Sequence, residues 1–160
     1  MATGTWHDED DEQVVERIAE LALRAGRTIA VAESLTAGHV SARLGAGTDA
    51  ATWFKGAVVA YDEGVKFKVL GVTPGPVVTD SCARQMAEGV RHLLGADLAI
   101  GITGVGGPGP EEGRPAGTVH LAEAGPDGTR SHEHHVPGDP GEVIARVTRL
   151  ALERFLHVLS

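Results

Sequence analysis

Two short stretches place side chains capable of acyl-transfer chemistry directly after apolar runs. In the first, AVAESLTAGH, the run ends at Glu33 and Ser34. The second, AYDEGVKFKVLGV, carries Tyr61 and Lys66 five residues apart. A serine hydroxyl becomes a nucleophile when a neighbouring base takes its proton, and a lysine whose pKa is lowered by burial can be that base. Together the stretches predict a Ser–Lys site for amide hydrolysis, in which Tyr61 relays the proton or holds the lysine.

Each of these residues also has an ordinary structural interpretation. A serine between a strand and a helix is commonly an N-cap. Ser34 does not lie in the G-x-S-x-G turn of the α/β-hydrolases, and the sequence offers it no obvious histidine base. A lysine on a helix is usually a solvated charge, as we expect of Lys68. Lys66 differs because it follows Tyr61 by about one helical turn, close to the end of a predicted strand.

A glycine-rich loop and a histidine-rich strand suggest two rival sites. The run GVGGPG at 104–109 matches G-x-G-x-x-G formally, but a dinucleotide site needs a helix to open there. Prolines and then a strand follow instead, so a backbone nest for a phosphate or ribose is the better interpretation. In HEHH, His132 and His134 share one strand face, and no further ligand is placed to complete a metal site. We therefore predict no metal and no cofactor.

The composition limits the classes of protein that the chain can belong to. Its 160 residues suit one domain, and its net charge of −8 argues against a nucleic-acid surface, which needs clustered Lys and Arg. The single Cys82 excludes an intrachain disulfide. No apolar run approaches the roughly 18 residues of a membrane span, and the first residues lack a signal-peptide pattern. These features predict a cytoplasmic protein that binds neither membrane nor nucleic acid.

Helices and strands alternate along most of the chain. We expect a mobile acidic tail over residues 1–11 and a single domain over 12–160. Strands are predicted at 28–33, 56–61 and 97–103, followed by a hairpin around GPDG at 125–128; helices are predicted at 14–25, 36–44, 62–70, 78–95 and 141–159. This order predicts a layered α/β domain with a mixed sheet. Because ligands bind at the carboxyl ends of strands in such sheets, Ser34, Tyr61 and Thr103 should meet at one edge.

Five ordered motifs resemble one known family. AESLTAG, WFKGAVVAY, VKFKVLGV, GADLAIGITGVGGPGP and RPAGTV occur in that order. Together they resemble the C-terminal domain family of CinA, the competence- and damage-inducible protein, from about residue 11 to 158. Stand-alone members of the family include a nicotinamide-nucleotide amidohydrolase. The resemblance implies a three-layer α/β/α sandwich with a mixed, mostly parallel sheet, and a homodimer.

The resemblance also implies a reaction and a site. The reaction is the deamidation of nicotinamide mononucleotide, a small-molecule nucleotide substrate, to nicotinate mononucleotide and ammonia. The catalytic serine, tyrosine and lysine fall on Ser34, Tyr61 and Lys66, with N–H groups at the start of the 35–44 helix holding the oxyanion. The residues expected to contact the substrate are Glu33, Thr36, Gly38, Thr103, Gly104, Gly106 and Gly107.

The sequence departs from the family pattern where a phosphate would bind. The family often carries two arginines at the positions of Pro140 and Ile144, and a guanidinium fork fits a phosphate well. Arg114 or Arg146 could substitute for them. Two hypotheses follow. The chain is an amidase for nicotinamide mononucleotide or a related amide, or it is a CinA-like domain that binds a nucleotide or a partner without catalysis.

Overall fold

The computed structural model describes residues 8–160, with side chains from residue 11 onward. Along the chain the elements are α1 (Asp8–Ala25), β1 (Ile29–Glu33), α2 (His39–Gly45), α3 (Ala50–Trp53), β2 (Phe54–Val59), α4 (Glu63–Leu70), α5 (Asp80–Leu94), β3 (Leu98–Gly104), β4 (Thr118–Gly125), β5 (Gly128–His135) and α6 (Pro140–Leu159). Part of the predicted acidic tail is therefore helical, because α1 already begins at Asp8. The remaining tail residues, 1–7, lie outside the described part of the chain.

The five strands form one mixed sheet in the order β2-β1-β3-β4-β5. Strand β1 is parallel to both β2 and β3, whereas β4 is antiparallel to β3 and to β5. Four strands thus run in one direction and β4 alone opposes them. The interior strand β1 is buried along its whole length, which explains why its sequence, IAVAE, is a nearly continuous apolar run.

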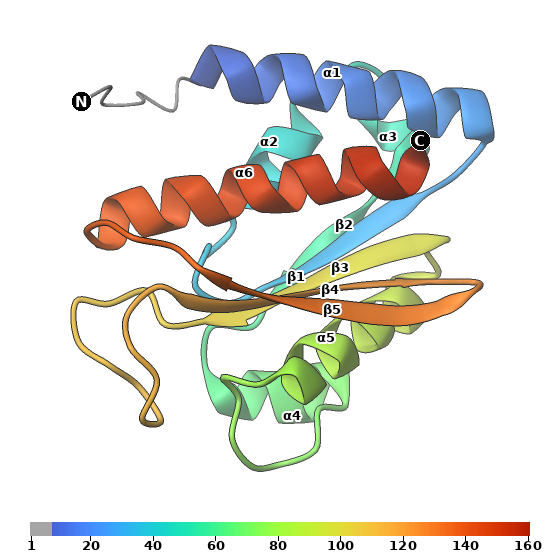
Figure 1. The fold of residues 1–160 in the computed structure, drawn as a ribbon. Helices are drawn as coiled ribbons and strands as arrows, with labels where there is room; N and C mark the ends of the chain where they lie inside the picture. Colours follow the sequence, from blue (N-terminus) through green and yellow to red (C-terminus); the bar gives the residue numbers. More distant parts are fainter. Residues whose placement is uncertain (1–7) are drawn as a thin grey trace.

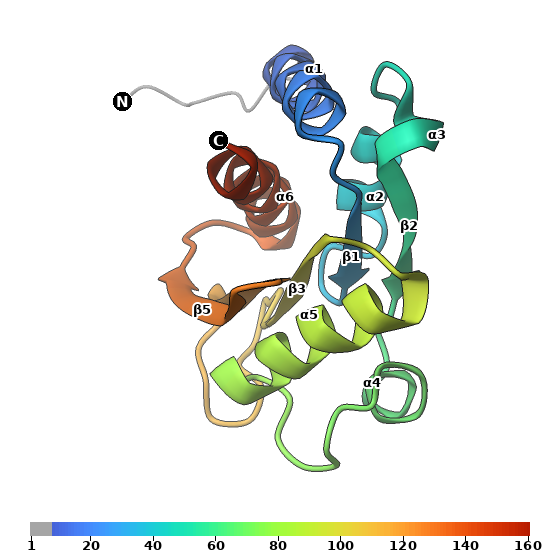
Figure 2. The same cartoon turned by 90° about the vertical axis from the view of Figure 1, so that its right-hand side faces the viewer.

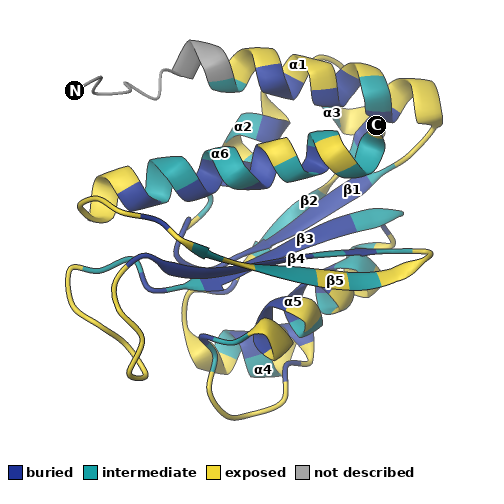
Figure 3. Cartoon of the chain, viewed as in Figure 1, coloured by how far each residue is buried: buried dark blue, intermediate teal, exposed yellow. Residues whose placement is uncertain are grey.

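Helices cover both faces of this sheet, as Figure 1 and the perpendicular view in Figure 2 show. Helices α1, α2, α3 and α6 lie on one side, and α4 and α5 lie on the other. Each face has its own apolar core, the first built around Ile18, Trp53 and Phe155 and the second around Leu70 and Met86. Figure 3 shows the buried residues concentrated between the layers. The predicted three-layer α/β/α sandwich is confirmed.

The segment after β1 differs from its prediction in a way that matters for the site. A helix was expected from Thr36, but α2 begins at His39. The intervening residues form a tight turn in which Ala37 and Gly38 adopt left-handed backbone angles, with φ of 46° and 96°. A helix cannot pass through left-handed residues, so its start is delayed. Ser34 therefore lies in a turn between the strand and the helix.

No helix within residues 8–160 is both long enough and apolar enough to cross a membrane.

Candidate active site

A cavity of about 410 Å³ opens at the edge of the sheet where β1, β2 and β3 end. This volume lies within the range of small-molecule sites. Its lining comes from the turn after β1, the start of α4, the segment before α5, the glycine-rich loop after β3 and the start of α6. The lining residues are Ser34, Leu35, Tyr61, Asp62, Glu63, Lys66, Val77, Val78, Thr103, Gly104, Gly106, Gly107, Glu111, Pro140 and Ile144.

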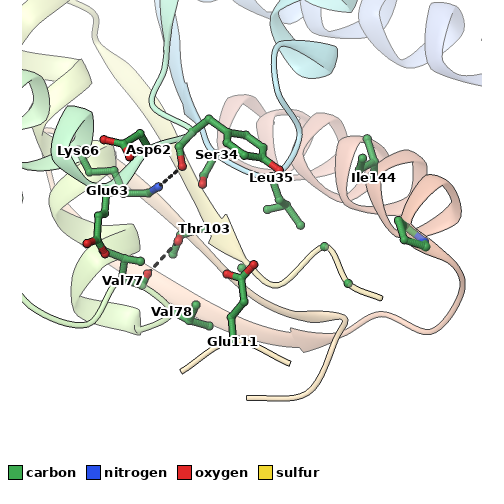
Figure 4. A pocket seen from close by; sticks show the side chains of 15 residues that line it. Ser34, Leu35, Asp62, Glu63, Lys66, Val77, Val78, Thr103, Glu111 and Ile144 are labelled. Atoms are coloured by element: carbon green, nitrogen blue, oxygen red, sulfur yellow. Dashed lines mark hydrogen bonds between the residues drawn. The ribbon is translucent and has the colours of Figure 1, made fainter. Parts of the chain in front are cut away.

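The structure brings the three predicted catalytic residues to this one cavity. Ser34, Tyr61 and Lys66 all line it, although they come from two separate loops and a helix. Figure 4 shows the side chains of Ser34 and Lys66 close together, with the carboxylate of Glu111 facing the same space from another side. The meeting follows from the parallel arrangement of β1 and β2, which places both carboxyl ends at the same edge.

Ser34 is positioned by the strand and by the turn behind it. Its side chain is largely buried, with the residue 7% exposed, and its carbonyl oxygen accepts the N–H of Ala37 at 3.0 Å. Its hydroxyl has no hydrogen-bond partner within residues 8–160, so it does not cap α2. The N-cap interpretation of Ser34 is wrong, and its hydroxyl is available to an acceptor or to a substrate.

Glu33 performs the capping that was considered for Ser34. This carboxylate is fully buried and accepts the N–H groups of Val40 at 3.0 Å and Ser41 at 2.9 Å, together with the Ser41 hydroxyl at 2.6 Å. An acceptor with negative charge is favourable at a helix N-terminus. The N–H groups of Val40 and Ser41 are therefore occupied by Glu33, so an oxyanion donor from this segment has to come from the turn before α2.

Lys66 is a buried lysine with a neutral partner. It is 2% exposed, and its Nζ donates to the backbone carbonyl of Tyr61 at 3.1 Å. Burial lowers the pKa of Lys66, although Cys82 and the carboxylates of Asp62, Glu63 and Glu111 oppose that shift. Lys66 forms no ion pair within residues 8–160. An amine in this setting loses its proton more readily than a solvated lysine does, as a general base requires.

Tyr61 holds the lysine through its backbone. The carbonyl of Tyr61 fixes the position of Lys66 Nζ, while the tyrosine residue itself is 70% exposed at the cavity. The side chain is thus free to meet a ligand that enters the cavity. Two roles were predicted for Tyr61, relaying the proton and holding Lys66. Its main-chain carbonyl does the second.

The glycine-rich loop forms the opposite wall. Gly104 must be glycine, because a Cβ there would lie 2.5 Å from the carbonyl oxygen of Thr118 on the neighbouring strand. Farther along, the carboxylate of Glu112 accepts the N–H groups of Val77 and Val78, with shortest distances of 2.7 and 3.0 Å. This contact ties the glycine-rich loop to the segment before α5, so that both walls keep their positions.

Thr103 also belongs to this wall of the cavity, and its hydroxyl is used in a contact within the protein. Its hydroxyl donates to the carbonyl of Val77 at 2.8 Å, and the residue is 1% exposed (Figure 4). Thr103 therefore supports the cavity through a contact within the protein.

The thiol of Cys82, near Thr103, is also buried, and burial raises its pKa to about 11. A thiol held in its neutral form is a poor nucleophile, which leaves Ser34 as the candidate in this region.

Some predicted substrate contacts lie outside the cavity. Thr103, Gly104, Gly106 and Gly107 line it, but Glu33, Thr36 and Gly38 do not. Glu33 caps α2, Thr36 is fully buried, and Gly38 supplies the left-handed residue before the helix. Their motif has a folding role: it turns the chain sharply after Ser34 and leaves the serine at the cavity.

The sequence reasoning missed several acidic and apolar lining residues. Asp62, Glu63 and Glu111 bring three carboxylates to the cavity, and Val77 and Val78 bring apolar surface. Asp62 and Glu63 could have been found from their place at the start of a predicted helix, directly after Tyr61. Glu111 lies in an irregular loop, and only the fold shows that it returns to the site.

The two arginines considered as substitutes lie elsewhere. Arg114 pairs with Glu133 at 3.4 Å, and Arg146 donates to the carbonyl of Pro137 at 2.8 Å. Neither arginine lines the cavity, whereas Pro140 and Ile144 do.

In the described part of the chain, no group of three or more His, Cys, Asp or Glu residues is arranged to hold a metal ion.

A three-layer α/β/α domain with a serine and a buried lysine at the carboxyl edge of its sheet has close counterparts. The sequence profile of the CinA C-terminal domain matches residues 11–159, and the chain belongs to this family. A CinA-like protein of Frankia casuarinae is 40% identical over 155 residues, covering 94% of this chain, and one of Prochlorococcus marinus is 41% identical over 157 residues, also covering 94%. The chain spans only 36% and 35% of the lengths of these relatives.

Solved structures agree with this assignment. A CinA superfamily protein from Escherichia coli superposes with a TM-score of 0.90 at 30% identity, covering 95% of this chain and 92% of its own. A CinA superfamily protein from Klebsiella pneumoniae gives 0.89 at 32% identity, with coverage of 93% and 97%. The family resemblance predicted from the sequence motifs is confirmed.

Proposed function

We propose that the protein is an amidohydrolase in which Ser34 attacks a carboxamide and Lys66 accepts the serine proton. The resemblance to nicotinamide-nucleotide amidohydrolases makes nicotinamide mononucleotide the first substrate to test, with nicotinate mononucleotide and ammonia as products. The observation that carries the proposal is the buried Lys66, whose burial lowers its pKa and whose Nζ is held by the Tyr61 carbonyl beside Ser34. A lysine without such a role is usually solvated at the surface, whereas Lys66 is buried.

The reaction follows from these positions. The neutral amine of Lys66 removes the hydroxyl proton while Ser34 Oγ forms a bond to the carboxamide carbon. The tetrahedral intermediate collapses, and ammonia leaves with a proton returned by Lys66. Water, activated by the same amine, then cleaves the acyl–Ser34 ester. The backbone N–H of Leu35, the next residue in the turn, is a candidate donor to the oxyanion in place of the occupied α2 terminus.

The competing function is a binding domain without catalysis. The observation in its favour is that Pro140 and Ile144 line the cavity where a phosphate would need cationic partners. The two functions are separated by measuring ammonia release from purified protein with a panel of pyridine carboxamides. Release that is lost in Ser34→Ala supports the amidase, and its absence across the panel supports the binding domain.

A further inference from the structure

The cavity is acidic at the positions where a nucleotide substrate would extend from the reacting amide. Asp62, Glu63 and Glu111 line it, and all three are exposed to its solvent. Among the described lining residues the single basic one is Lys66, which must be neutral in order to act as the base. The working form of the site therefore carries negative charge without a cationic group to balance it.

Helix N-termini, the other usual anion sites, are already occupied around this cavity. Asp62 caps α4 by accepting the N–H of Gly64, and Asp139 caps α6 by accepting the N–H of Glu142. The first residue of α6 is Pro140, which has no N–H to offer. On the neighbouring helices, Glu33 holds the start of α2 and Thr79 caps α5.

These two features disfavour a phosphate and favour a positive charge. A phosphate dianion entering the cavity would meet carboxylates, capped helices and the apolar surface of Pro140 and Ile144. The glycine-rich loop at 104–109, where a backbone nest was predicted, adds no positively charged side chain. A pyridinium ring, which carries its positive charge on the ring next to the carboxamide, would instead meet Glu111 across the cavity from Ser34 (Figure 4). Opposite charges within a partly closed site attract more strongly than they do in bulk water.

We infer that the site selects cationic pyridinium carboxamides that carry no phosphate, with Glu111 as a specificity-determining residue. Nicotinamide riboside is the representative of this class, and nicotinamide mononucleotide is its phosphorylated counterpart. The inference rests on the proposed amidase activity, because that activity fixes the carboxamide at Ser34. The inference adds to that activity the charge that the site prefers in the part of the substrate beyond the carboxamide.

The test compares kcat/KM for the riboside and the mononucleotide with the wild-type protein at one pH and one low ionic strength. We expect the riboside to be favoured by about tenfold or more, since each poorly compensated charge contact contributes several-fold. The ring charge is common to both compounds, so Glu111→Gln acts on their ratio by easing repulsion of the phosphate. We expect the ratio to fall by about threefold, which is typical of one partly exposed charge pair. The matched control Glu88→Gln, an exposed carboxylate on α5 that is away from the cavity, should leave the ratio unchanged.

Two readouts distinguish failure of the inference from failure of the proposed function. Ammonia release with equal or greater kcat/KM for the mononucleotide overturns the selectivity and leaves the amidase in place. Absence of release from every pyridine carboxamide overturns the amidase. Calorimetric binding to Ser34→Ala then decides the selectivity directly: tighter binding of the riboside supports it, and tighter binding of the mononucleotide, or no binding of either compound, overturns it.

Discussion

The two sides of the cavity are built in different ways. On the β1/α4 side, which carries Ser34, Tyr61 and Lys66, the proposed catalytic groups are held by a buried strand, a capped helix and a carbonyl–amine hydrogen bond. On the loop side, which carries Glu111 and Pro140, the lining is exposed and comes from an irregular loop and a helix end. In the proposed amidase, the core of the fold would therefore fix the chemistry, whereas exposed residues would decide the choice of substrate.

The sharpest test of the β1/α4 side is removal of its nucleophile. Ser34→Ala should lower kcat/KM for any hydrolysed carboxamide by about 10⁴-fold or more, because the covalent step disappears. Thermal unfolding should be nearly unchanged, since the hydroxyl has no hydrogen-bond partner among the described residues. Ser81→Ala on the exposed surface of α5 serves as the control. Turnover near that of the wild type would remove Ser34 from the mechanism.

Replacement of the base should have the next largest effect. Lys66→Arg keeps a positive charge but cannot lose its proton, so we expect a loss of about 10³-fold in kcat, within the range of general-base catalysis. Lys66→Ala should lose a similar amount. Lys68→Arg, on the exposed face of the same helix, is the matched control and should retain activity. An active Lys66→Arg variant would show that this position supplies charge only.

The pH profile tests the same side without a substitution. Because burial lowers the pKa of Lys66 and the neutral amine is the working form, kcat/KM should rise with pH up to that pKa and then level off. The rise should be about tenfold per pH unit below the pKa, and the plateau should begin at lower pH than a solvated lysine would give. A profile that is flat from acid to alkaline pH contradicts the assigned role.

Glu33 tests whether the motif before Ser34 serves folding or binding. Glu33→Gln removes a buried negative charge that accepts three hydrogen bonds, so the free energy of unfolding should fall by about 2 kcal/mol. This corresponds to about a 30-fold change in the folding equilibrium. Urea denaturation measures it, with Glu88→Gln as the control. Unchanged stability together with a raised KM would restore Glu33 as a substrate contact.

On the loop side the smallest effect is expected. The double variant Pro140→Arg with Ile144→Arg should lower the KM for nicotinamide mononucleotide by about tenfold, because charge-assisted contacts to a phosphate contribute roughly 1.5–3 kcal/mol each before ordering costs. Steady-state kinetics should show the change mainly in KM. Arg114→Ala should change little, since Arg114 is paired with Glu133 away from the cavity. The opposite pattern would place the phosphate near Arg114.

The same contrast explains what the sequence could and could not predict. Ser34, Tyr61 and Lys66 were predictable because regular strands and a helix carry them to one edge, and periodicity locates such elements. The start of α2 was not predictable in this way, because the left-handed backbone at Ala37 and the hydrogen bonds of Glu33 leave no periodic pattern in the sequence. The position of Glu111 at the cavity was not predictable from the sequence either.

The parts of the site that depend on long-range contacts were the ones missed. Glu111 lies in a loop without periodicity, and its approach to the cavity depends on Glu112 reaching the segment before α5. The two arginines offered as phosphate ligands were misplaced for the same reason, since only the folded chain shows Arg114 paired with Glu133 and Arg146 with the Pro137 carbonyl. Spacing along the sequence carries no information on such pairings.

The Glu112 contact has a consequence for motion at the cavity. Because the carboxylate of Glu112 accepts the N–H groups of both Val77 and Val78, it links the glycine-rich loop to the segment before α5. We therefore expect the fluctuations of the two segments to be correlated, because moving one without the other breaks these hydrogen bonds. The width of the cavity mouth should then depend on a joint displacement of both segments, limited by a carboxylate that is not among the proposed catalytic groups.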